Sequence, residues 1–329
     1  MANGYARELT IAIEAVRDAA RLCRAVQQEV ATGILEKDDK SPVTIADFGS
    51  QALVCRMLSR EFANDPVIAE ENASWLRKPE NDDLRDRVIS HVMRVHPLAD
   101  AHEILDWIDH GNARAYSDRF WTLDPVDGTK GFLRGDQYVV ALALIEEGEP
   151  VVSAMACPNF TFEGGTDTHT GAIFAAVRGE GTLRIPMDAE DGPHVVRVSD
   201  TADPSKARVC ESVEKEHSSH EHTAQVVERL GIREEPIRMD SQNKYALVAS
   251  GEADIYLRFP THPGRIEKVW DHAPGWLLVM EAGGVVSDIH GKPLEFNHGA
   301  ELSANRGVVV TNRWLYEQVM EAVRAVSDS

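Results

Sequence analysis

The sequence has little positive charge, and this shortage already limits what the protein can bind. Lys and Arg number 34 against 54 Asp and Glu, which gives a net charge of −20 with neutral histidines. Proteins that bind a nucleic-acid backbone show the opposite balance, so we expect no nucleic-acid partner. An acidic surface also repels small polyanions, so the binding of a phosphorylated substrate would require local positive charge, such as that of a metal ion.

Other patterns that mark a chemistry or a location are missing as well. The four cysteines, Cys23, Cys55, Cys157 and Cys210, form no CxxC pair or zinc-like spacing, and we expect buried, reduced thiols. No GxSxG or P-loop motif is present. No apolar run approaches 18 residues, and the first residues lack the pattern of a secretory signal. We therefore expect a soluble, cytoplasmic protein with no membrane partner.

The 329 residues, 43% of them apolar, are enough for one large or two ordinary domains. Apolar residues at helical spacing predict a long helix from Leu9 to Ile34, followed by a loop over Lys37–Pro42. A second helix is expected over Asp47–Phe62. Residues 77–119 are charged and weakly periodic, which is consistent with surface helices and loops.

The sequence pattern changes after these segments, because strand-like runs follow at 137–145, 151–157 and 172–177. A hairpin loop at Glu147 to Glu149 is expected to join the first two runs. They predict an antiparallel sheet. Beyond residue 190 short apolar runs alternate with helix-length segments, which is typical of an α/β domain. The expected strands are 207–210, 253–257, 284–287 and 307–310, and the expected helices are 218–230, 241–250, 272–282 and 312–325. We predict an N-terminal α+β domain over 1–190 and a C-terminal α/β domain over 191–329.

The most informative string is Asp124-Pro125-Val126-Asp127-Gly128-Thr129, in which an apolar run ends in two carboxylates three residues apart. Two carboxylates and the carbonyl between them suit a hard cation such as Mg²⁺. The turn that follows exposes backbone N–H groups that suit a phosphate. An ordinary Asp-Gly turn explains the same residues, and the string alone leaves both interpretations open.

Three more acidic positions bear on this choice. Asp47 lies at the expected start of the second helix and Asp271 just before another, so both could be N-caps. Glu70 follows the short apolar run 67–69, where a solvated strand end is the simple explanation. Each position alone is more often structural than catalytic.

Taken in order, Glu70-Glu71, Asp124 to Thr129, and Trp270-Asp271 with Gly275 resemble the signature of the inositol monophosphatase superfamily, whose members are lithium-sensitive, magnesium-dependent phosphatases. The order and spacing cover most of the chain. Pro274 replaces a small residue that is usual in the last motif, and we expect it to alter the start of that helix without moving the carboxylate.

Within the superfamily, longer segments resemble the branch of 3′(2′),5′-bisphosphate nucleotidases. These segments are Asp124–Arg134, Ser212–His220, Asp240–Tyr245 and Ala253–Arg258. The resemblance implies a layered αβαβα fold with the site between the two domains. Without it, His217, Lys244 and Arg258 would be interpreted as a solvated loop and surface charge.

The resemblance also implies roles for individual residues. Two or three Mg²⁺ ions would be held by Glu70, Asp124, the carbonyl of Val126, Asp127 and Asp271. Asp47 and Thr129 would position and deprotonate the attacking water. The substrate would be bound by Gly128, Thr129, His217, Ser241, Lys244, Arg258 and Asp271.

The expected reaction is hydrolysis of the 3′-phosphate of adenosine 3′,5′-bisphosphate to AMP and phosphate, with no covalent intermediate. This reaction belongs to sulfur metabolism, and 3′-phosphoadenylyl sulfate is a second candidate substrate. One alternative is an inositol (poly)phosphate phosphatase with the same metal site, and another is a catalytically inactive regulator that binds metal or nucleotide. We expect a monomer, with a homodimer as the alternative.

Overall fold

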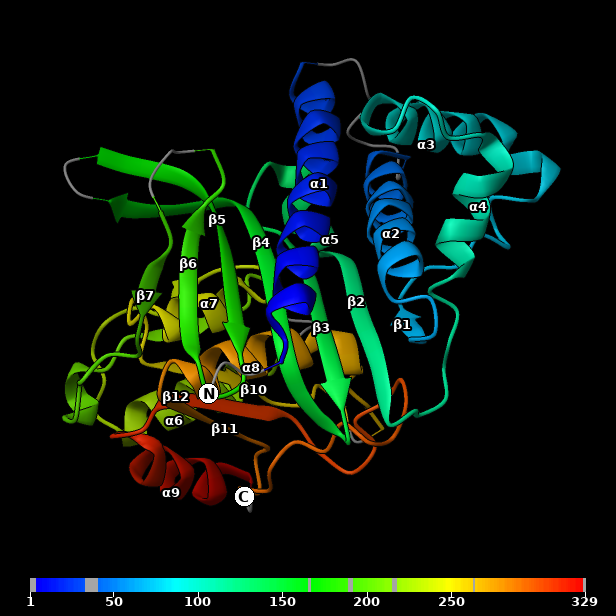
Figure 1. Cartoon of the computed structure of the whole chain (residues 1–329). Coiled ribbons are helices and arrows are strands. Elements are labelled where there is room, and N and C mark those ends of the chain that lie inside the picture. Colours follow the sequence, from blue (N-terminus) through cyan, green and yellow to red (C-terminus); the bar gives the residue numbers. More distant parts are fainter. Residues whose placement is uncertain are drawn as a thin grey trace.

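Two β-sheets alternate with three layers of helices in the computed structural model, which describes residues 4–32, 41–164, 167–188, 192–214, 218–262 and 264–327 (Figure 1). Helices α1 (Ala6–Ala31) and α2 (Ser41–Glu61) cover one face of the first sheet. Helices α7 (Asn243–Ala249) and α8 (Ala273–Glu281) lie between the two sheets. Helices α6 (His220–Arg229) and α9 (Tyr316–Ser327) cover the second sheet. The αβαβα layering predicted from the resemblance is therefore confirmed.

Among the described residues, the first sheet has seven strands in sequence order; β1 and β2 run parallel, and the other neighbouring pairs are antiparallel. The predicted antiparallel run is confirmed as β3 to β5, while β6 and β7 extend the sheet beyond the prediction. Glu147 and Gly148 both have positive φ and close a two-residue hairpin. The strands are β1 (Val67–Ala69), β2 (Arg119–Asp127), β3 (Val139–Glu146), β4 (Glu149–Gly164), β5 (Asp167–Val177), β6 (Gly181–Pro186) and β7 (His194–Val196).

The second sheet is mixed, with the order β11-β12-β10-β8-β9. Its strands are β8 (Val209–Glu211), β9 (Ile237–Arg238), β10 (Ile255–Arg258), β11 (Gly284–Ser287) and β12 (Val308–Asn312). The remaining elements are η1 (Pro79–Asn81), α3 (Asp82–Val95), α4 (Ala101–Asp109), α5 (Thr129–Arg134), η2 (Pro204–Lys206) and η3 (Val269–Asp271). None of the described helices has the length and hydropathy needed to cross a bilayer. The domain boundary at residue 190 stays a prediction.

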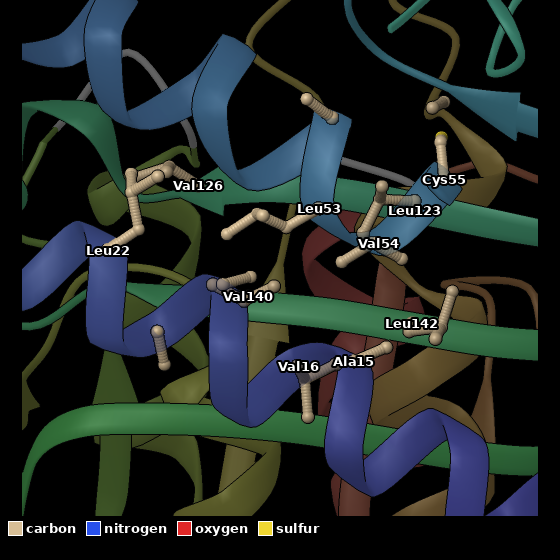
Figure 2. Packing of buried hydrophobic residues seen from close by; sticks show 14 of the residues in the cluster. Ala15, Val16, Leu22, Leu53, Val54, Cys55, Leu123, Val126, Val140 and Leu142 are labelled. Atoms are coloured by element: carbon tan, nitrogen blue, oxygen red, sulfur yellow. The ribbon is translucent and has the colours of Figure 1, made fainter. Parts of the chain in front are cut away.

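The apolar stripe of α1 packs on α2 and on the first sheet (Figure 2). Ala15, Val16 and Leu22 of α1 meet Leu53 and Val54 of α2 in one buried cluster with strand residues of β2 and β3. All four cysteines are buried and free, as predicted, and burial raises the pKa of each thiol. This packing fixes the position of β2, whose end carries the Asp124 motif.

Two expectations about helix starts were wrong. Helix α2 begins at Ser41, so Asp47 lies inside the helix and is not its N-cap. The reason is that Pro42 occupies the first turn, where a missing N–H costs nothing. The N-cap residue of α8 is His272, so Asp271 is not a cap either. Residues 37–40 of the predicted loop lie outside the described residues.

Pro274 lies in the first turn of α8, and its carbonyl accepts a hydrogen bond of 2.9 Å from the Ser153 hydroxyl on β4. The helix is therefore anchored to the first sheet at the point where it begins.

Candidate active site

Parallel pairing of β1 and β2 brings the first carboxylates together. Ala69 is paired with Leu123, so Glu70 leaves β1 beside Asp124. In a regular strand, residues 124 and 127 would point to opposite faces, because side chains alternate. The pairing with β3 shifts register between Asp124 and Asp127, and this irregularity lets both carboxylates line the same cleft.

The cleft has a volume of about 220 Å³ and lies where β2, α5, α7 and η3 meet. It collects ten of the residues predicted for the site. These are Glu70, Asp124, Val126, Asp127, Gly128, Thr129, Ser241, Lys244, Arg258 and Asp271. Asp47 does not line the cleft, and His217 lies outside the described residues.

The carboxylates of the cleft repel one another. Asp124 is 3% exposed, and its Oδ1 atom has no hydrogen-bond partner in the part of the chain that the structure describes. Burial raises its pKa well above the usual value, and the charges of Glu70 and Asp127 add to this. Burial and the charge of Asp271 raise the pKa of Glu70 to about 8. An unpartnered oxygen among crowded carboxylates is the donor set that a hard cation takes, so these residues fit a metal ion.

The two residues predicted to position and deprotonate the attacking water differ in burial. Asp47 is 5% exposed, and its pKa is raised by burial and then by Glu70 and Glu71. Thr129 is exposed at the start of α5. Among the described residues no direct hydrogen bond joins the two side chains. Asp47 is therefore a buried neighbour of Glu70 and Glu71, whereas Thr129 is exposed to solvent at the cleft.

Two cations face the carboxylates. Lys244 is buried on α7, and its Nζ donates to the carbonyls of Met239 (3.0 Å) and Ser241 (2.6 Å). Burial lowers its pKa to about 8. Arg258 ends β10, with Nη2 at 2.7 Å from Glu267 Oε2 and 3.6 Å from Asp271 Oδ2. Burial opposes the charge of Arg258, but Glu267 raises the pKa of the guanidinium above its ordinary value.

Sequence reasoning missed Glu267, which organises this side of the cleft. Glu267, Asp271 and His272 present ligand atoms within 4.8 Å of one another, a spacing that could hold a metal ion. However, Arg258, Arg265 (3.1 Å) and His272 (3.4 Å) already bind the Glu267 carboxylate. Although burial opposes ionisation, Arg258 and His272 keep the pKa of Glu267 well below its usual range. We interpret this group as an ion-pair network that orients Arg258 beside Asp271.

Sequence reasoning also missed Gln242, which joins the two ends of the site. Its backbone N–H donates to Asp127 Oδ2 at 2.6 Å. Its side-chain amide donates to the Trp270 carbonyl (3.0 Å) and accepts from the Gly275 N–H (3.2 Å). The only signal in the sequence was its place inside the Asp240–Tyr245 segment.

The fold and the site together define the class of protein to which the chain belongs. The profile of the inositol monophosphatase family matches residues 5–328, and the chain belongs to this family of metal-dependent phosphatases. Solved structures agree on the fold. An inositol monophosphatase from Anabaena superposes with a TM-score of 0.62 at 20% identity, covering 98% of this chain and 97% of that one. CysQ from Bacteroides thetaiotaomicron gives 0.63 at 19% identity over 94% and 98%.

Curated relatives narrow the class to one branch. The 3′(2′),5′-bisphosphate nucleotidase of Schizosaccharomyces pombe is 44% identical over 97% of this chain and 96% of its own length. The enzyme of the same name from Emericella nidulans is 41% identical over 98% and 99%. That from Oryza sativa is 40% identical over 98% and 95%. The predicted resemblance to this branch is confirmed.

Proposed function

We propose that the protein hydrolyses the 3′-phosphate of adenosine 3′,5′-bisphosphate to AMP and phosphate. The observation that carries the proposal is a cleft lined both by the carboxylates of Glu70, Asp124 and Asp127 and by the cations of Lys244 and Arg258. A substrate with two phosphates matches this combination. One phosphate reaches the carboxylate side, where it is cleaved, and the other is held by the cations. The names of the curated relatives support a 3′(2′),5′-bisphosphate nucleotide as the substrate class.

The carboxylate side would hold Mg²⁺, in two or three ions. The residues that would hold it are Glu70, Asp124, the Val126 carbonyl, Asp127 and Asp271. When bound, the metal supplies positive charge that stabilises the charge developing on the transferred phosphoryl group. Its charge also offsets the mutual repulsion of the carboxylates, so the metal-free site should repel its own substrate.

The chain's own residues would then orient the substrate and move the proton. Gly128 and Thr129, at the start of α5, contact the phosphoryl group from the open side of the cleft. Asp47 accepts the proton of the attacking water, with Thr129 as the hydroxyl that positions that water. Ser241, His217 and Asp271 contact the nucleotide.

The proposal extends to several properties that follow the same branch. We infer inhibition by millimolar Li⁺, action on 3′-phosphoadenylyl sulfate as a second substrate, and a role in sulfur metabolism. We also infer a cytoplasmic location, a monomeric state with a homodimer as the alternative, and the two-domain division near residue 190.

The test is phosphate release from adenosine 3′,5′-bisphosphate with Mg²⁺, compared with release from inositol monophosphate. We expect faster turnover of the nucleotide, and no turnover after chelation of the metal. A Lys244→Ala variant should lose nucleotide turnover while it retains metal binding, measured by calorimetry. Faster turnover of inositol monophosphate would instead assign the site to inositol phosphates. Metal binding without turnover of either compound would indicate an inactive regulator.

A further inference from the structure

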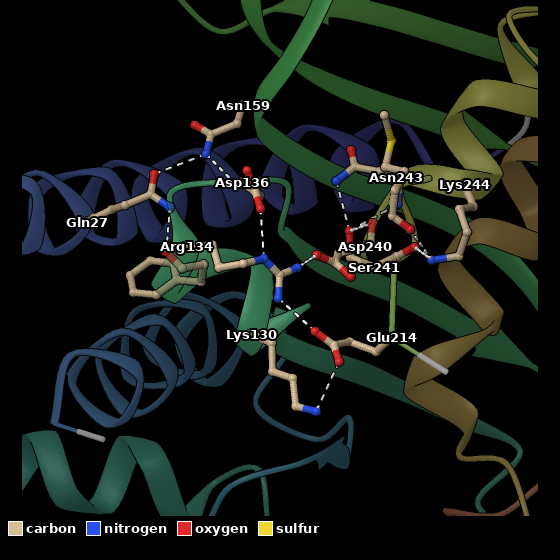
Figure 3. Close-up of polar contacts among 12 residues, drawn as sticks. Gln27, Lys130, Arg134, Asp136, Asn159, Glu214, Asp240, Ser241, Asn243 and Lys244 are labelled. Atoms are coloured by element: carbon tan, nitrogen blue, oxygen red, sulfur yellow. Dashed lines mark hydrogen bonds and ion pairs between the residues drawn. The ribbon is translucent and has the colours of Figure 1, made fainter. Parts of the chain in front are cut away.

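Arg134, the last residue of α5, contacts three carboxylates at once (Figure 3). Its Nε donates to Asp136 at 2.8 Å, its Nη1 to Glu214 at 2.7 Å, and its Nη2 to Asp240. Lys130, one turn earlier, adds a second cation at 3.3 Å from Glu214. Glu214 and Asp240 both line the cleft, whereas Arg134 does not. The arginine therefore lies behind the cleft wall and contacts the residues that form it.

The base from which Arg134 projects is fixed to the first sheet. Gln27 of α1 donates to the Phe132 carbonyl of α5 at 2.9 Å. Asn159 of β4 donates to Gln27 Oε1 at 3.0 Å and to the Asp136 carbonyl at 2.6 Å. These bonds hold both the end of α5 and the residue that follows it. The position of the guanidinium is thus set by the N-terminal half of the chain.

The two carboxylates that complete the contact belong to the C-terminal half. Glu214 follows β8, and Asp240 immediately precedes Ser241. Ser241 has a φ of 66°, a left-handed conformation that costs free energy in a residue other than glycine. Such a conformation persists only where its surroundings hold it, and the ion pair on Asp240 is one of the contacts that do so.

Two glycines allow this segment to approach α5 closely. A Cβ atom on Gly131 would lie 2.8 Å from Asp240 Oδ2, and one on Gly128 would lie 2.9 Å from the Ser241 Cβ. Gly128 and Gly131 both belong to the Asp124–Arg134 segment, which contains the turn proposed to bind phosphate. The same stretch of chain that completes the carboxylate cluster therefore sets the distance to the opposite wall.

We propose that Arg134 is a positioning residue for nucleotide specificity, acting through Asp240 and Glu214, an inference that rests on the proposed function. One cation holds two carboxylates that would otherwise repel each other, and so keeps Ser241 and Lys244 at a fixed distance from the phosphate-binding turn. The wall that it fixes is where the nucleoside and the uncleaved phosphate bind. Arg134 itself pairs with Asp136, Glu214 and Asp240, none of which is a proposed metal ligand. The wall touches the carboxylate cluster at Asp127, through the backbone N–H of Gln242. Loss of Arg134 should therefore weaken nucleotide recognition more than phosphoryl transfer.

The experiment compares two substrates in Arg134→Met, namely adenosine 3′,5′-bisphosphate and p-nitrophenyl phosphate, which lacks a nucleoside and a second phosphate. We expect KM for the nucleotide to rise about tenfold with kcat within about twofold, which is the signature of lost uniform binding. Both constants for p-nitrophenyl phosphate should stay within about twofold. The KM of Arg134→Lys for the nucleotide should lie between those of the unaltered protein and Arg134→Met, because an ammonium group cannot bond three carboxylates in a fixed fork.

Two further variants separate positioning from a general loss of structure. Arg85→Met removes an arginine that also pairs with two carboxylates, Asp82 and Asp86, but within α3 and outside the cleft. It should leave both KM values unchanged. The double variant Arg134→Met/Glu214→Gln should have a KM for the nucleotide no higher than that of Arg134→Met alone. Arg134→Met already removes the ion pair through which the two residues act.

The outcomes separate this inference from the proposed function. If the unaltered protein does not hydrolyse the nucleotide, both fail. If it does, and Arg134→Met changes the two substrates equally or changes neither KM, only the role of Arg134 is refuted. Independent, multiplying effects of Arg134→Met and Glu214→Gln would refute it as well.

Discussion

The burial of Lys244 leads to a pH dependence that can be worked out from the structure. Its ammonium group is enclosed, and burial lowers its pKa to about 8. A lysine with a lowered pKa is charged below that value and neutral above it. If this charge holds the uncleaved phosphate, nucleotide binding should weaken as the pH rises through 8.

The size of the effect follows from the charged fraction. With a pKa of about 8, the charged fraction of Lys244 falls from about nine-tenths at pH 7 to about one-tenth at pH 9. Because kcat/KM reports the free enzyme, its value for adenosine 3′,5′-bisphosphate should fall about tenfold over this range. Adenosine 3′-monophosphate lacks the uncleaved phosphate, so its kcat/KM should not show this fall.

The assay is phosphate release at saturating Mg²⁺ from pH 6.5 to 9.5 with both substrates. The ratio of the two kcat/KM values cancels effects of pH on the metal and on the attacking water. In Lys244→Met the ratio should be low at all pH values and flat, matching the unaltered protein at high pH. A flat ratio in the unaltered protein, or a falling ratio in the variant, would refute the assignment of the phosphate to Lys244.

Three other predictions concern charge in and around the cleft. Mg²⁺ at about one hundred times its dissociation constant should stabilise the protein by about 2.7 kcal/mol, measured as a rise in Tm. Asp124→Asn should raise the Tm of the metal-free protein, because it removes a carboxylate that repels its neighbours. The same variant should abolish turnover and the rise in Tm that Mg²⁺ causes. An unchanged rise in Tm with Mg²⁺ would exclude Asp124 as a ligand. Glu267→Gln should cost about 3 kcal/mol at pH 7, measured by urea unfolding, because it leaves Arg258 without its main partner. The pKa of Glu267 is lowered on folding, so its contribution to the free energy of unfolding is complete above the unfolded pKa of about 4.3 and is lost as the pH falls below that value. The difference in unfolding free energy between Glu267→Gln and the unaltered protein should therefore shrink in acid. A difference that persists in acid would contradict this assignment.

The regular elements of the fold were predictable because their signals are local. The spacing of apolar residues in α1 specifies a helical period and one buried face. The short apolar run of β3 instead indicates a strand that is buried on both faces. Strands β7 and β9, of three and two residues, are too short to show a period, and their pairing partners decide them. The start of α2 was misplaced because a proline that ends one helix is equally at home in the first turn of the next.

The identity of the site residues was also local, but their arrangement was not. Nothing in the sequence around Asp127 indicates that the backbone N–H of Gln242, 115 residues away, donates to its carboxylate. Nor does the sequence around Arg258 indicate that Glu267 neutralises it, because that pairing requires the chain just before η3 to lie against the end of β10.

The sequence by itself determined which groups are present, namely an acidic chain with a carboxylate motif, two cations in its C-terminal half and the period of each long element. The tertiary structure decided which of these groups meet. Parallel pairing of β1 with β2 brings Glu70 beside Asp124, the irregularity in β2 turns Asp124 and Asp127 to one side, and burial changes the pKa values of Lys244 and Glu70. The physical reason is that periodicity acts over a few residues, whereas desolvation and the repulsion of like charges depend on distances that only the folded chain sets.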